Sequence, residues 1–111
     1  MNTMNQLSVV LVRFPFTNQI DYKIRPALII SNNRFNNQHP FSWVLPITTQ
    51  ETKREFEINI PSTEFTRELK AKSFILTDKI MSMEKHLFLK EIGKITPKLF
   101  ERVKAQLTKN L

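Results

Sequence analysis

The chain has 111 residues, 41% of them hydrophobic, so it can bury one core but not two. It has no cysteine, which excludes disulfides and thiolate metal ligands, and no apolar run of the roughly 20 residues that a bilayer-spanning helix needs. Its 17 Lys and Arg against 10 acidic residues give a net charge of +7, which favours a polyanion: nucleic acid, an acidic protein or an anionic membrane surface. No basic region precedes the first apolar stretch, as it would in a secretion signal, so we expect one cytoplasmic domain over residues 1–111.

Strands are predicted for the first half of the chain. Residues 9–16 are apolar on both strand faces, which indicates a strand covered on both sides. A polar connection is expected at residues 17–24, followed by a second strand at 25–31 with Pro26 at its entry. The asparagines at 32–33 and 36–37 are typical of turns.

The second half is predicted to continue with short strands and to end in a helix. Pro46 indicates an edge or a bulge in a third strand at about residues 42–49. Further strands are expected at residues 55–60, 73–83 and 90–95, with a loop at 61–69 that has room for one helical turn. Thr96 and Pro97 resemble an N-cap and first helical residue, and an apolar stripe follows to Leu111. Five to six short strands and one terminal helix predict a mainly β fold, a small barrel with a C-terminal helix.

Few side chains form a recognisable catalytic pattern. His39 and His86 lie on separate predicted loops, and no histidine or carboxylate has metal-ligand spacing, so we expect no metal or cofactor. Phe14, Phe16 and Trp43 have the chemistry to stack on bases, but their strand spacing favours packing.

Arg25 and Thr48 are the better candidates. Arg25 precedes Pro26, which restricts its backbone, and a guanidinium presents a fork of donors that suits a phosphate. Thr48 ends the third predicted strand, and its hydroxyl could donate to the same phosphate. A surface ion pair and an ordinary strand residue are the alternatives, and the residues alone leave this open.

Five segments in order resemble the MazF/PemK toxin family. They are residues 9–16 (VVLVRFPF), 24–32 (IRPALIISN), 45–50 (LPITTQ), 76–80 (LTDKI) and 92–99 (IGKITPKL). The resemblance covers about residues 7–111, and it is the ordered set, not any one segment, that is specific. It implies an SH3-like barrel of the MazF and CcdB type, a homodimer that cuts single-stranded RNA, and an antitoxin partner with a disordered, acidic tail.

The resemblance also implies site residues. The key arginine and threonine of the family fall on Arg25 and Thr48, and an acidic residue proposed as a base in some members falls on Asp78. RNA contacts are implied at Thr17, Asn18, Gln19, Gln50 and Ser73. The reaction would be transesterification by the substrate 2′-OH, in which Arg25 stabilises the phosphorane charge and Thr48 positions an oxygen. The general base stays open between Asp78, Arg25 and a glutamate.

One departure concerns the N-terminal edge. Many members have Gly-Asp where this chain has Leu7-Ser8, which removes a flexible turn and a carboxylate that could cap backbone. We therefore expect a different local shape there, with no effect on Arg25 or Thr48.

Assembly is expected to be symmetric. Because the first strand is apolar on both faces and one barrel has little core to cover it, Val9 or Leu11, or the C-terminal apolar stripe, should meet a second copy. An acidic antitoxin tail should compete with RNA and bind more weakly in salt.

Two other functions stay open. One is a toxin of the same fold that binds a protein such as gyrase through its C-terminal helix, against which the retained Arg-Pro pair and threonine argue. The other is a barrel that binds RNA without cleaving it.

Overall fold

The computed structural model describes residues 4–15 and 22–111. Within them lie seven antiparallel strands, two α-helices and two 3₁₀ turns, so the expected mainly β fold with a C-terminal helix is confirmed. In chain order the elements are β1 (Ser8–Pro15), β2 (Tyr22–Ile29), α1 (Asn33–Gln38), β3 (Phe41–Thr48), β4 (Glu57–Asn59), η1 (Ser62–Glu64), β5 (Phe74–Leu76), β6 (Met81–Glu84), η2 (Lys85–Leu87), β7 (Phe88–Lys94) and α2 (Pro97–Lys109).

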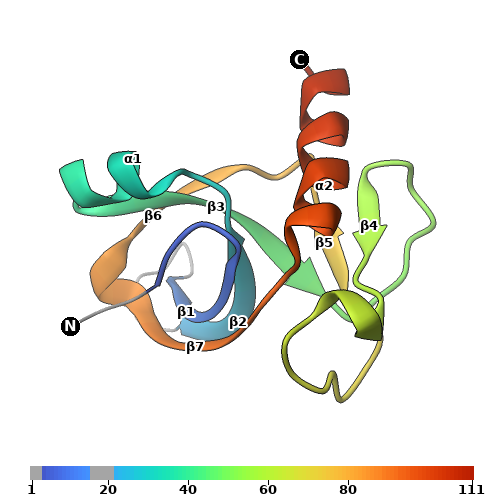
Figure 1. Ribbon diagram of the computed structural model, residues 1–111. Coiled ribbons are helices and arrows are strands. Elements are labelled where there is room, and N and C mark those ends of the chain that lie inside the picture. The colour runs from blue at the N-terminus through green and yellow to red at the C-terminus, as the bar shows by residue number, and fades with distance from the viewer. Residues whose placement is uncertain (1–3, 16–21) are drawn as a thin grey trace.

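The sheet curls into a barrel because β3 changes partners along its length. The strand order is β4-β5-β3-β2-β1-β7, and β6 also pairs with β3. The first half of β3 pairs with β6 and its end pairs with β5. Because η2 joins β6 directly to β7, the chain closes a ring through β7, β1, β2, β3 and β6 (Figure 1).

Both faces of β1 are covered within one chain. Val10 and Val12 belong to a cluster inside the barrel, with Ala27, Ile29, Val44 and Met83. Val9 points to the other face, where it joins a larger cluster under α2 that includes Leu99, Phe100 and Val103. Val9 is 2% exposed. The expectation that β1 needs a second copy to cover it is therefore wrong, since β4, β5 and α2 supply the second layer.

Several element boundaries differ from those expected. β2 begins at Tyr22, because it pairs with β1 along its whole length up to Pro15. The single strand expected at residues 73–83 is two strands, β5 and β6, which pair with different parts of β3. Pro46 lies neither on an edge nor at a bulge, but where β3 changes partners from β6 to β5. There its missing N–H breaks neither of those two ladders.

The paired asparagines form a short helix and not a turn. Asn32 caps α1, and its side-chain oxygen accepts a hydrogen bond of 2.8 Å from the backbone N–H of Phe35. Asn36 is buried and makes two hydrogen bonds with Ser31. Its side-chain oxygen accepts from the Ser31 hydroxyl, and its side-chain NH₂ donates to the Ser31 carbonyl. Burial and capping stabilise this turn of helix, and neither can be seen from asparagine pairs alone.

The N-terminal edge takes the shape that glycine would favour, although it lacks glycine. Leu7 has φ +81°, in the left-handed region, which costs a branched residue about 1 kcal/mol. Leu7 nevertheless packs against the cluster under α2, and the Ser8 hydroxyl donates to Glu91. The Leu7-Ser8 departure thus keeps the turn at the cost of strain, and the Ser8 hydroxyl oxygen caps the backbone by accepting a 3.1 Å hydrogen bond from the Asn5 N–H.

The C-terminal helix agrees with expectation. The Thr96 hydroxyl oxygen accepts a 3.1 Å bond from the Leu99 N–H, and Pro97 opens α2. η1 supplies the expected helical turn between β4 and β5. No helix among residues 4–15 and 22–111 has both the length and the apolarity to span a bilayer.

Candidate nucleic-acid interface

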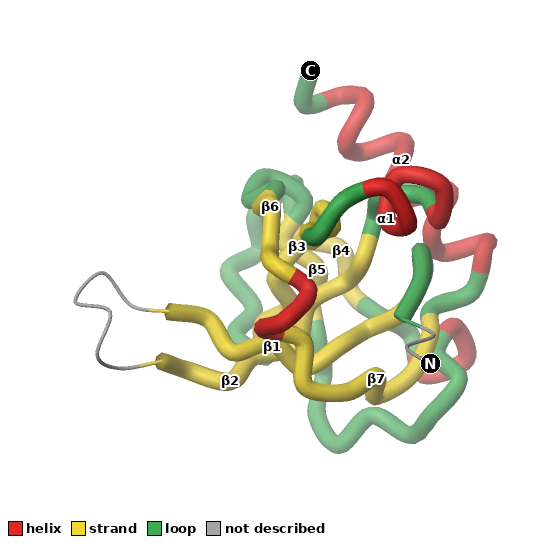
Figure 2. Tube along the Cα trace, turned by 90° about the vertical axis from the view of Figure 1, so that its left-hand side faces the viewer, coloured by secondary structure: helices red, strands yellow, loops and turns green. Residues whose placement is uncertain are grey.

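Arg25 lies inside β2, at the point where the sheet widens from two strands to three. It pairs with Val12 of β1, while the ladder to β3 begins two residues later at Ala27. Its β3 side therefore has no strand neighbour, and the side chain is exposed. Figure 2 shows β1 and β2 running together away from the rest of the barrel on this side. The sequence placed Arg25 at a strand entrance, whereas the structure places it where the three-stranded part begins.

Thr48 is the last residue of β3 and pairs with Phe74 of β5. Its hydroxyl oxygen accepts a 3.1 Å hydrogen bond from the backbone N–H of Gln50. That bond orients the hydroxyl, and its hydrogen is bonded to no described residue. Thr48 therefore presents an oriented hydrogen-bond donor at the end of its strand.

Arg25 and Thr48 line the same hollow, which has a volume of about 380 Å³ and which we call the Arg25 hollow. The two residues come from β2 and β3, which follow one another in the chain and are neighbours in the sheet. The hollow is lined by Phe14, Lys23, Arg25, Pro46, Ile47, Thr48, Leu76, Lys79 and Met81. Its walls thus combine apolar side chains with cations and one hydroxyl.

The electrostatics of the Arg25 hollow are one-sided. Lys23, Arg25 and Lys79 line it, and among the residues that the structure describes no carboxylate does. Within the described part of the chain, none of these three cations forms an ion pair. Three positive charges around a concave surface attract phosphates, because the low-dielectric walls focus their field.

Two of these cations were missed at the level of sequence. Lys23 has a readable signal, since it stands two residues before Arg25 and so shares its strand face. Lys79 has none: the turn after β5, closed by a backbone bond from Lys79 N–H to the Leu76 carbonyl, brings it to the hollow.

The aromatic residues divide between two places. Phe14 lines the Arg25 hollow while also packing against the barrel cluster. Trp43 lies elsewhere, 45% exposed, with its ring 4.7 Å from that of Phe35. Phe16 lies outside the described residues. Among the described aromatic residues, Phe14 is therefore the one placed to meet a base at the Arg25 hollow.

The implied RNA contacts do not all gather there. Thr17, Asn18 and Gln19 lie outside the described residues. Gln50 is exposed and contributes its backbone N–H to Thr48, but it does not line the Arg25 hollow. Ser73 lines a different hollow, and its hydroxyl donates a 3.1 Å hydrogen bond to the Ala71 carbonyl.

Asp78 is not brought to the Arg25 hollow. It lines a hollow with Phe56 and Leu107, and its carboxylate accepts bonds of 2.6 and 3.2 Å from Arg54. The hydrogen bond from Arg54 is the main cause that lowers the pKa of Asp78. A carboxylate with a lowered pKa is a weaker proton acceptor. Its visible role is to tie the loop that follows β3 to the turn that carries Lys79.

Replacing Asp78 with Asn should destabilise the fold at neutral pH and matter less in acid. Because the pKa of Asp78 is lowered on folding, its stabilisation is present above the unfolded-state pKa and is lost as pH falls through the folded-state pKa. Urea unfolding at about pH 7 and about pH 3 tests this. Glu55→Gln, on the same loop, is the control and should change little at either pH. If Asp78→Asn lowered the free energy of unfolding equally at both pH values, the ion-pair explanation would be contradicted.

The histidines stand apart from the Arg25 hollow. His39 stacks on Phe35 at 4.1 Å, and its Nδ1 lies 2.8 Å from the Phe35 carbonyl oxygen. His86 is exposed, with Nδ1 3.9 Å from Glu84. In the described ranges, no group of three His, Cys, Asp or Glu side chains could hold a metal ion.

The fold and the Arg25 hollow define a class: a small β-barrel with a C-terminal helix and a basic, concave surface suited to phosphates. Residues 5–111 match the family described as PemK-like, MazF-like toxin of type II toxin–antitoxin systems. The chain belongs to this family, as the resemblance implied. No curated protein matches it significantly.

Solved structures show the same fold. A chain of the MazE–MazF complex from Deinococcus radiodurans superposes with a TM-score of 0.79 at 20% identity, covering 96% of this chain and 94% of that one. An endoribonuclease in complex with its cognate antitoxin, from a mycobacterial species, gives 0.76 at 17% identity, covering 95% and 91%. The Mycobacterium tuberculosis toxin MazF-mt6 gives 0.69 at 19% identity, covering 91% and 93%.

Proposed function

We propose that this chain is an endoribonuclease toxin that cleaves single-stranded RNA by transesterification without a metal ion. The observation that carries the proposal is the Arg25 hollow, where Arg25, Thr48 and two further cations surround a concave space that no carboxylate of residues 4–15 and 22–111 lines. Membership of the toxin family and the endoribonucleases among proteins of the same fold support it.

In the proposed reaction the RNA supplies the nucleophile, and the Arg25 hollow stabilises the charge that develops. The 2′-oxygen attacks the adjacent phosphorus and gives up its proton, and the bond from phosphorus to the 5′-oxygen breaks. The leaving 5′-oxygen takes up a proton, and the products are a 2′,3′-cyclic phosphate and a 5′-OH. Arg25 stabilises the charge that grows on the phosphorane oxygens, and the Thr48 hydroxyl donates to one of them. Lys23 and Lys79 hold neighbouring phosphates.

The proton acceptor is assigned to neither Asp78 nor any other single group. Arg54 already holds the Asp78 carboxylate outside the Arg25 hollow. Asp78→Asn should therefore retain cleavage, with any loss arising from the loosened turn that carries Lys79.

Incubation with a long RNA of mixed sequence in EDTA tests the function. We expect cleavage to persist and the fragments to carry 5′-OH ends, because the attacking group belongs to the RNA. An RNA with 2′-deoxy nucleotides at the cut sites should resist. Strict magnesium dependence, or cleavage of the deoxy substrate, would refute transesterification, and binding without cleavage would identify a non-catalytic RNA-binding barrel.

We also propose an acidic antitoxin as partner, seated on the Arg25 hollow in competition with RNA. Two of the similar structures are of toxins with their antitoxins. The net charge of +7 and the three cations of the Arg25 hollow favour acidic side chains as well as phosphates. Antitoxin binding that leaves RNA binding unchanged would contradict a shared surface.

The proposed homodimer would use an apolar patch beside the C-terminal helix, and not β1. Trp43, Ile80 and Leu111 are 45%, 51% and 98% exposed, and they line one hollow of about 420 Å³ with Ile30 and Leu107. A two-fold contact buries such a patch against its own copy.

Sedimentation should therefore show a dimer at micromolar concentration and a monomer for Ile80→Glu, because a buried, unpaired carboxylate is costly. Leu89→Glu is the matched control: Leu89 is 42% exposed and lines none of the hollows described, so this variant should stay dimeric. A wild-type monomer, or dimers of both variants, would contradict this interface.

A further inference from the structure

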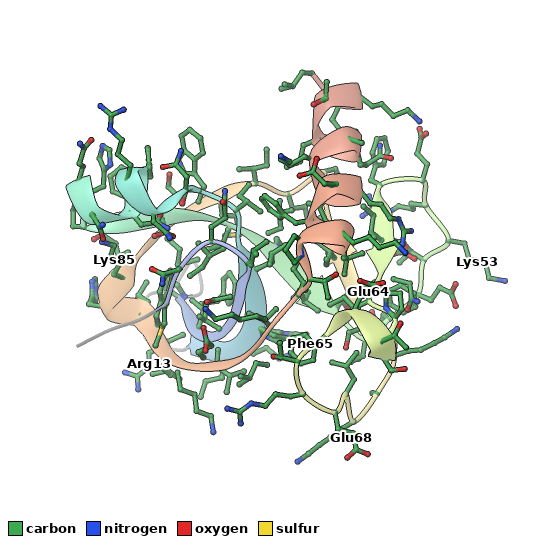
Figure 3. All side chains as sticks on the ribbon, in the orientation of Figure 1. Arg13, Lys53, Glu64, Phe65, Glu68 and Lys85 are labelled. Atoms are coloured by element: carbon green, nitrogen blue, oxygen red, sulfur yellow. The ribbon has the colours of Figure 1, made fainter. Side chains whose placement is uncertain are left out.

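A second basic concave surface lies on the other face of the sheet, between β7 and the loop that follows η1. We call it the Lys90 hollow, and its volume is about 480 Å³. Leu11 and Ile92 of the sheet and Phe65 of the loop contribute to its apolar floor. Figure 3 shows Phe65 on the barrel side of this loop and Glu68 at its outer end.

The rim of the Lys90 hollow is positively charged. Arg67, Lys70 and Lys90 line it, and of the carboxylates in the described ranges only that of Glu68 does. These cations are exposed, and no ion pair among the described residues engages any of them. The proposed reaction does not use this charge.

The Lys90 hollow adjoins the Arg25 hollow around the end of β3. Thr48 lines one and Thr49, the next residue, lines the other. Across the sheet, Leu11 of β1 pairs with Pro26 on one side and Lys90 on the other. Two strand spacings, about 10 Å, thus separate the residue after Arg25 from Lys90.

We infer that the Lys90 hollow binds phosphates of the RNA strand outside the cleaved bond, after the strand crosses the end of β3. The inference takes its substrate class from the proposed function. An acidic peptide would satisfy the same charges, but continuity with the Arg25 hollow favours one strand that occupies both. Lysine contacts to phosphate carry no base specificity, so this surface adds affinity for longer RNA and leaves the cleavage step unchanged.

Binding measurements test this without relying on cleavage. The probes are mixed-sequence 2′-O-methyl RNAs of about 6 and about 16 nucleotides, within the range of known single-strand sites. The variant is Lys70→Gln with Lys90→Gln. The matched control is Lys98→Gln with Lys109→Gln, which removes the same charge from exposed positions on α2. Thermal unfolding of each variant checks the fold.

We expect the Lys70/Lys90 variant to bind the longer probe about tenfold more weakly and the shorter probe as the wild type does. The slope of log affinity against log salt should fall by about 1.4, for two phosphate contacts on a single strand. The control variant should keep the length dependence.

Wild-type binding of both probes by the Lys70/Lys90 variant, or an equal loss in the control, would overturn the inference. If the variant instead lost only binding to poly-glutamate, the surface would belong to an acidic protein. A wild type with this length-dependent binding but no cleavage would refute the proposed function and leave the inference standing. Cleavage by a wild type whose binding does not depend on RNA length would refute the inference and leave the proposed function standing.

Discussion

Arg25→Lys and Arg25→Ala should both lower the single-turnover cleavage rate at saturating RNA by about 10²–10³, or roughly 3–4 kcal/mol. The planar guanidinium can donate two parallel hydrogen bonds to oxygens whose charge grows in the transition state, and a lysine ammonium cannot reproduce that fork. RNA affinity should fall only modestly, because Lys23 and Lys79 stay in the same hollow. The fold should survive, since Arg25 is exposed and without an ion pair in the described chain.

Two further variants make this prediction specific. Arg34→Lys, at an exposed arginine of α1 that lines no described hollow, should cleave like the wild type. Thr48→Ala should lose less than Arg25→Ala, because a neutral hydroxyl contributes less than a charged donor pair. A near-wild-type rate for Arg25→Lys would reduce Arg25 to a general attractor of RNA and remove the main support for catalysis.

Gly93→Ala should destabilise the protein by about 3 kcal/mol, at the upper end for overpacking. Gly93 is buried in β7 opposite Val9, and a Cβ there would lie 2.3 Å from the Phe65 ring. Such a distance forces the ring or the strand to move. Phe65 also forms the isolated β-bridge with Ile95 that ties the β4–β5 connection to the end of β7. Urea unfolding gives the change in free energy.

A double substitution tests whether that ring is the cause. Phe65→Leu removes the atoms nearest the added methyl, so Gly93→Ala should cost less in the Phe65→Leu background than alone, while the strain of a side chain at φ +159° stays. Additive costs in the double variant would show that β7 and not Phe65 resists the methyl group.

Local patterns identified the elements that are stabilised locally. The Thr96-Pro97 start and the apolar stripe of α2 could be read directly, because capping and helical periodicity act within a few residues. The asparagine helix α1 could not, since the burial of Asn36 against Ser31 depends on packing. The division of residues 73–83 into β5 and β6 also escaped, because it follows from two separate pairings with β3.

By itself the sequence determined a mainly β chain with a C-terminal helix, a strongly basic balance and, through ordered motifs, the toxin family with Arg25 and Thr48 as its candidate residues. Only the tertiary structure decided which side chains share a surface. Arg25 and Thr48 line one hollow together with Lys23 and Lys79. The Asp78 carboxylate instead forms an ion pair with Arg54. The physical reason is that spacing encodes which face of an element is buried, whereas the closure and register of the sheet set which distant residues meet.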